Sequence, residues 1–107
     1  MPTVQHGLVD QAKINAAVQR AQRALKPDVV RIMYSLTVDW TGEQSLFFRV
    51  LLSDRASAPH RLRETTQRII AKIQDETKAE ELGLQTYFNF RSKSEQEKLR
   101  EPFWEEP

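Results

Sequence analysis

Few side chains in this sequence are of the types that bind metals or act as strong nucleophiles. The chain contains no cysteine, and its two histidines are His6 and His60. A protein zinc site needs three or four His, Cys or carboxylate ligands at suitable spacing, and the residues around these histidines do not supply such a set. We therefore expect no metal site, and we expect both histidines to be solvated.

Three other groups have residue types that could act as catalysts. Ser92-Lys93-Ser94 lacks the buried strand–turn–helix setting that activates a serine, and capping of a helix explains Ser94 better. The neighbouring acids Glu80-Glu81 do not converge on one proton, because adjacent residues of a helix point in different directions. Asp54 and His60 could approach one another, but such a pair is more often a helix cap than an acid–base couple. We predict no catalytic residue and no cofactor, and a small enzyme remains the second alternative.

Composition restricts the class of protein further. The chain has 107 residues and a net charge of +1, so we expect one domain over residues 1–107, with a loose tail at residues 1–6. Near neutrality argues against a large non-specific footprint on nucleic acid. No segment has the roughly 18 apolar residues of a membrane span, and we see no signal peptide. These features predict a cytoplasmic protein without membrane contact.

The clearest pattern is an alternation of apolar and polar residues from Val30 to Trp40. A period of two over this length predicts a β-strand with one buried face, here over residues 29–40. Even positions in residues 44–52 continue the apolar row, and residues 41–43 form the turn of a hairpin. If Trp40 faces Gln44, both apolar rows share one face and Met33 lies opposite Leu51.

Helical and strand periodicities complete the order helix–strand–strand–helix–strand. Apolar residues recur at helical spacing in residues 8–25 and 59–77, residues 84–91 alternate as a third strand, and Ser94 with Glu97 has capping-box spacing for a short terminal helix. Residues 92–107 then form this short helix and a Phe-Trp tail. This order is similar to that of K-homology-like RNA-binding domains and of the dimerisation domains of cation-efflux transporters. The Gly-X-X-Gly loop of the former and the metal-binding histidines of the latter are missing from this sequence.

We predict an α+β two-layer sandwich of αββαβ order. Its three-stranded sheet is expected to be antiparallel with the order 2-1-3, so that the first strand is central and both long helices cover one face. The expected core consists of apolar residues from the inner face of the sheet and from the two helices: Val18, Ile32, Tyr34, Leu36, Val38, Leu46, Phe48, Val50, Leu62, Ile69, Ile73, Phe88 and Phe90.

The opposite face of the predicted sheet mixes aromatic, aliphatic and arginine side chains, and it is too apolar to be left wholly to water. Three occupants are possible: the Phe103-Trp104 tail of the same chain, a second copy in a two-fold dimer, or a nucleic acid whose bases stack on aromatic rings. The expected interaction surface consists of Arg31, Met33, Phe47, Arg49, Leu51, Tyr87, Arg91, Phe103 and Trp104.

From this surface we predict a small intracellular, non-enzymatic protein-interaction module. Its expected partner is a second copy or another protein, bound through the open face or through the edge of the second strand around Leu46-Phe47-Phe48. RNA binding on the same face is the first alternative. The sequence does not specify the pathway or the partner.

Overall fold

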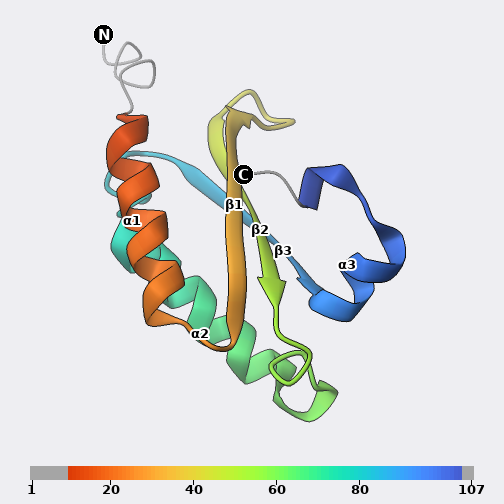
Figure 1. Cartoon of the computed structure of the whole chain (residues 1–107). Helices are drawn as coiled ribbons and strands as arrows, with labels where there is room; N and C mark the ends of the chain where they lie inside the picture. The colour runs from red at the N-terminus through yellow and green to blue at the C-terminus, as the bar shows by residue number, and fades with distance from the viewer. Residues whose placement is uncertain (1–9, 105–107) are drawn as a thin grey trace, which may run out of the picture.

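The computed structural model describes residues 10–104, so the expected tail at residues 1–6 falls outside the described residues. Within these residues, seven elements follow one another (Figure 1). They are α1 (Gln11–Ala24), β1 (Val29–Val38), β2 (Gln44–Leu52), α2 (Pro59–Thr77), β3 (Gln85–Ser92), α3 (Lys93–Leu99) and the 3-10 helix η2 (Pro102–Trp104). The α+β class and the order of the five main elements agree with the sequence prediction.

The predicted strand order 2-1-3 is wrong. The sheet has the order β1-β2-β3, with β2 in the centre. β1 runs antiparallel to β2, whereas β3 runs parallel to β2, so the sheet is mixed. The crossover through α2 joins neighbouring strands and does not pass over β1. The physical reason lies in β2, whose residues Leu46 to Leu52 are almost continuously apolar, a pattern typical of a strand covered on both faces.

The β1–β2 hairpin keeps the predicted parity but not the predicted register. Val38 lies opposite Gln44, so the pairs from Arg31 to Val38 are shifted by two residues from the expected pairing. The shift arises because β1 ends at Val38 and the chain turns immediately afterwards. The N–H of Gly42 donates to the carbonyl of Asp39 at 3.0 Å, and the N–H of Asp39 donates to the carbonyl of Glu43 at 2.9 Å. Gly42 has φ +89°, as expected for the left-handed residue that closes such a hairpin loop.

The ends of the two long helices follow from local sequence. Asp10 caps α1, because its Oδ1 accepts hydrogen bonds from the N–H groups of Ala12 and Lys13 at 3.0 and 3.2 Å. Pro59 begins α2, where a proline costs no hydrogen bond. The residue before it is Ala58, and no side chain caps this helix.

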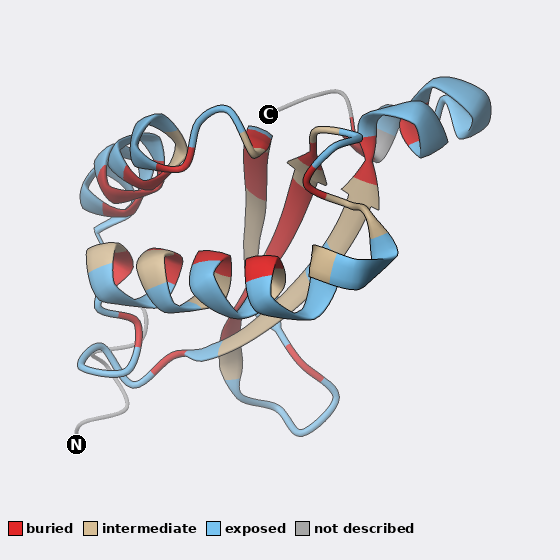
Figure 2. Ribbon diagram, turned by 90° about the horizontal axis from the view of Figure 1, so that it is seen from below, coloured by how far each residue is buried: buried red, intermediate tan, exposed pale blue. Residues whose placement is uncertain are grey.

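α1 and α2 lie on one side of the sheet and α3 lies on the other (Figure 1). The buried residues of α1 and α2 face the sheet and each other (Figure 2). The core that they close combines buried side chains from both helices and all three strands with partly buried Tyr34, Leu36, Phe88 and Phe90. Two expected core residues lie outside it, because Val38 is 59% exposed at the end of β1 and Leu62 is 37% exposed in the first turns of α2.

The short helix α3 begins two residues earlier than predicted. Its capping box is formed by Ser92 and Glu95, not by Ser94 and Glu97. The N–H of Glu95 donates to Ser92 Oγ at 3.1 Å, and the N–H of Ser92 donates to Glu95 Oε1 at 2.9 Å. Because the cap is the last residue of β3, the chain turns directly from the sheet edge onto the face opposite α1 and α2.

The different burial of residues on one face of α2 gives a first testable prediction. Ile69 is fully buried, so Ile69→Ala should lower the free energy of unfolding by about 2–5 kcal/mol. Leu62 lies on the same sequence stripe, but its exposure limits the cost of Leu62→Ala to below about 1 kcal/mol. Urea denaturation followed by circular dichroism measures both values, and equal losses would contradict the packing described here.

Candidate interaction surface

The C-terminal segment of the chain covers part of the sheet face that lacks α1 and α2. Trp104 is only 8% exposed, and the guanidinium of Arg91 on β3 lies 4.5 Å from the centre of its ring. Arg91 also forms an ion pair with Glu101 at 2.6 Å and donates to Gln96 Oε1 at 2.9 Å. The tail of the same chain was the first expected occupant of this face, and Trp104 of that tail does lie on it. The side chain of Phe103 lies outside the part of the chain that the structure describes.

Burial removes several expected surface residues from solvent. Met33 is buried, and it lies opposite Arg49 and not opposite Leu51 as predicted. Leu51 is partly buried and lies opposite Arg31. Arg49 is buried, it donates to Ser35 Oγ at 3.1 Å, and its burial lowers the pKa of the guanidinium. Phe47, Leu51 and Tyr87 are the predicted apolar residues that stay partly exposed on the face.

A pocket of about 330 Å³ remains open between Phe47 and Trp104. Its wall combines these two aromatic rings with polar side chains of all three strands: Ser35, Thr37, Arg49 and Asn89. A pocket with aromatic walls and a few polar groups can take one apolar or aromatic side chain of a partner and fix its orientation. We call this cavity the open-face pocket.

Next to the open-face pocket, three aromatic rings form a continuous row. Phe47 and Tyr87 are stacked with their centres 4.8 Å apart, and Trp40 lies 5.1 Å from Tyr87 in a tilted contact. Trp40 is 78% exposed. We call Trp40, Tyr87 and Phe47 the aromatic row. A large exposed indole supported by two further rings is typical of protein contact sites, where tryptophan and tyrosine supply much of the binding energy.

The loop that carries Trp40 is held by one carboxylate. Oδ1 of Asp39 accepts from the N–H and the hydroxyl of Thr41 at 2.9 and 2.6 Å and from the N–H of Glu43 at 3.1 Å. Its Oδ2 accepts from the hydroxyls of Ser45 and Tyr87 at 3.0 and 2.9 Å. These bonds join the loop to β2 and β3. The backbone that presents Trp40 is therefore fixed before any partner binds, which lowers the entropic cost of binding.

The hydrogen bonds also set the acidity of the groups that share them. The hydroxyl of Thr41, and after it that of Tyr87, hold the pKa of the Asp39 carboxyl far below its usual range against the opposing effect of burial. The same hydrogen bond to Asp39 raises the pKa of Tyr87. The carboxylate therefore remains charged throughout the physiological range.

Trp40 is a functional candidate that the sequence pattern did not reveal. Its even number put it in the core-facing row of the first strand, but the strand stops two residues earlier. The signal that could have shown this is Asp39 with Gly42 three residues later, since Asp at the first and Gly at the last position are typical of a type I turn.

The other residues singled out for chemistry do not come together. His60 is exposed at the start of α2. Asp54 accepts from the N–H and hydroxyl of Ser94 at 2.9 and 2.6 Å, and these bonds lower the pKa of its carboxyl. Among residues 10–104 there is no group of three or more His, Asp or Glu side chains that could hold a metal ion. Within the same range, every helix is too short or too polar to cross a membrane.

Comparison with protein-family models, with curated proteins and with solved structures found no significant match.

The carboxylate of Asp39 predicts a pH-dependent contribution to stability. Its pKa is lower in the folded protein than the value of about 3.9 in an unfolded chain. The stabilisation is therefore complete above pH 5 and is lost as the pH falls toward the folded pKa. Asp39→Asn should have a lower melting temperature than the wild type at pH 7, and the gap should narrow between about pH 5 and pH 2.

Thermal unfolding followed by circular dichroism across this pH range measures the gap. Asp75→Asn is the matched control, because Asp75 is an exposed acid of α2. A gap between wild type and Asp39→Asn that does not change with pH would contradict the role given to the carboxylate.

Substitution of the two tryptophans of the chain should have very different effects on the free energy of unfolding. Trp104→Ala removes a buried ring and should lower the free energy of unfolding by about 1.5–3 kcal/mol. Trp40→Ala removes an exposed ring and should change it by no more than about 0.5 kcal/mol. Chemical denaturation of both variants tests this, and a large loss in Trp40→Ala would show that the indole supports the fold.

Proposed function

We propose that this protein is a non-enzymatic interaction module and that its partner on the open sheet face is a second copy of the chain. The observation that carries the proposal is Trp40, a large apolar side chain exposed on a loop that Asp39 holds in place. The open-face pocket lies on the same side of the sheet and shares Phe47 with the aromatic row. The exposed ring and the cavity that could receive it thus belong to one continuous surface.

Two-fold symmetry makes such a surface self-complementary. In a two-fold dimer, a residue of one copy contacts a given site of the other, and the reverse contact is made at the same time. Trp40 of each copy would enter the open-face pocket of its partner, between Phe47 and Trp104. Two buried indoles at the centre of an interface agree with the enrichment of tryptophan at binding hot spots.

The structure supports RNA less well than a second copy as the partner on this face. Binding to single strands combines base stacking on aromatic rings with cationic contacts to phosphates. The aromatic row could stack bases, but the cationic groups beside it are already engaged. Arg91 is paired with Glu101, Arg49 is buried and donates to Ser35, and the ionised Asp39 accepts a hydrogen bond from the hydroxyl of Tyr87. This arrangement favours an apolar protein contact over a polyanion.

Sedimentation equilibrium provides the test of this function. The wild type should be dimeric at tens of micromolar, whereas Trp40→Ala and Phe47→Asp should each shift the equilibrium toward monomer by at least about tenfold in dissociation constant. Leu82→Ala is the matched control, because it also removes an exposed apolar side chain but lies away from the open face. The control should dimerise like the wild type.

Two results would overturn the proposal. The first is a wild type that is monomeric at these concentrations, and the second is a dimer whose stability does not respond to either variant. Filter binding of mixed single-stranded RNA addresses the alternative. Salt-sensitive RNA binding that Trp40→Ala abolishes would assign the aromatic row to nucleic acid.

A further inference from the structure

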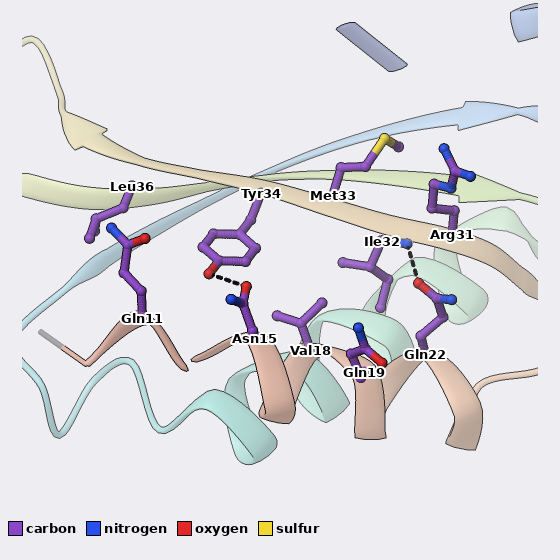
Figure 3. A pocket seen from close by; sticks show the side chains of 10 residues that line it. All are labelled: Gln11, Asn15, Val18, Gln19, Gln22, Arg31, Ile32, Met33, Tyr34 and Leu36. Carbon is purple, nitrogen blue, oxygen red and sulfur yellow. Dashed lines mark hydrogen bonds between the residues drawn. The ribbon is translucent and has the colours of Figure 1, made fainter. Parts of the chain in front are cut away.

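A second recess lies on a different part of the molecule, between α1 and the outer edge of the sheet. It has a volume of about 400 Å³, within the range of sites that bind small ligands and peptides. One wall is β1 from Arg31 to Leu36, and the other wall is the face of α1 turned toward this strand (Figure 3). We call this recess the edge groove.

The strand that lines the edge groove has a single strand neighbour. Within the described residues, β1 pairs with β2 only and forms one edge of the sheet. The N–H of Ile32 points away from β2, because it donates to a side chain of α1. Since backbone groups alternate in direction along a strand, those of Tyr34 and Leu36 point into the edge groove as well.

One hydrogen bond shows that this edge accepts an amide carbonyl from outside the sheet. The N–H of Ile32 donates to Oε1 of Gln22 at 2.9 Å. The oxygen of a primary amide is chemically equivalent to a backbone carbonyl, so Gln22 occupies the place that a neighbouring strand would fill at this position. A second amide, that of Asn15, accepts from the hydroxyl of Tyr34 at 2.6 Å.

The helix wall repeats this chemistry along its length. Gln11, Asn15, Gln19 and Gln22 line the edge groove from α1 at intervals of three or four residues, and the side chains of Gln11, Asn15 and Gln22 extend toward β1 (Figure 3). Each carboxamide can both donate and accept hydrogen bonds. A row of uncharged amides facing a strand edge suits the alternating N–H and C=O groups of an extended backbone. It would not retain a strongly charged ligand.

We propose that the edge groove binds an extended peptide segment of a partner protein, which adds to β1 as a fourth strand. Its backbone would pair with the outward groups of Tyr34 and Leu36, and its side chains on the helix side would be polar and uncharged to match the amides of α1.

A single extended chain fits this edge better than a second copy of the protein does. Antiparallel pairing of two β1 edges needs a two-fold axis perpendicular to the sheet, which leaves both copies of α1 on the same side of the joined sheet. Because α1 already reaches the edge through Gln22, the two helices would meet over the seam. A peptide strand brings no helix with it. The edge groove and the aromatic row therefore serve different partners.

The experiment uses nonapeptides selected from a random display library on the immobilised full-length chain and then synthesised. Selected peptides should bind the wild type, and the amide protons of Tyr34 and Leu36 should exchange more slowly in the complex. One version of each peptide is N-methylated at its odd-numbered positions and a second version at its even-numbered positions. One version should lose binding and the other should keep it, because only every second N–H of an added strand faces β1.

Leu36→Pro is the matched backbone variant. It removes an outward N–H and no bond of the β1–β2 ladder, so it should weaken peptide binding about five- to tenfold, as expected for one lost hydrogen bond. Since proline could disturb the strand, the double variant Asn15→Ala/Gln19→Ala provides a second test from the helix wall. Trp40→Ala should bind the peptides like the wild type, which separates this site from the open face.

Three results would overturn the proposal. They are a selection that yields no peptide with protection at Tyr34 and Leu36, equal effects of N-methylation in both parities, and binding that Trp40→Ala abolishes. Protection of Tyr34 and Leu36 in a dimer of the free protein would instead show a second copy on this edge, and it would exclude the peptide.

Discussion

The arrangement of the molecule depends on β2 being covered on both faces. On the helix side, Leu46, Phe48 and Val50 are fully buried beneath α1 and α2. On the other side, Ser45 and Arg49 are also buried, although both are polar. A strand whose side chains are largely buried on both faces is favoured in the centre of a sheet and needs some cover on each side. The position of β2 therefore decides that β1 and β3 are edges, and it requires the C-terminal segment to cover part of the second face.

The polar groups buried on that second face need hydrogen-bond partners at defined positions. Burying a charge is costly unless hydrogen bonds compensate for it. Arg49 contacts Ser35, and Asp39 accepts five hydrogen bonds from Thr41, Glu43, Ser45 and Tyr87. These contacts tie the hairpin loop to two strands. The same network that stabilises the loop also leaves one apolar side chain, Trp40, exposed in a fixed place.

Several charged side chains of the surface are paired with opposite charges. Arg91 is compensated by Glu101 and by the ring of Trp104, and Arg20 and Lys72 converge on Glu76 between the two long helices. The chain contains nearly as many acids as bases. Aromatic rings line the open face and amides line the edge groove, so the side chains that characterise the two candidate surfaces are mainly uncharged. Contacts of this kind recognise proteins through shape and hydrogen bonds.

The sequence alone determined the elements, because the period of the side chains is a local property. The order of helices and strands, the parity of the hairpin and the buried stripe of Ile69 and Ile73 all follow from this period. The sequence did not determine that β2 is central, that Trp40 leaves the core-facing row, or that Trp104 of the same chain covers part of the second face. Strand order depends on contacts between residues far apart in the chain. The free energies of these contacts cannot be read from a local pattern of residues. Only the tertiary structure decided these points. In the folded chain the almost continuously apolar β2 buries more apolar surface in the centre of the sheet than the alternating β1 would.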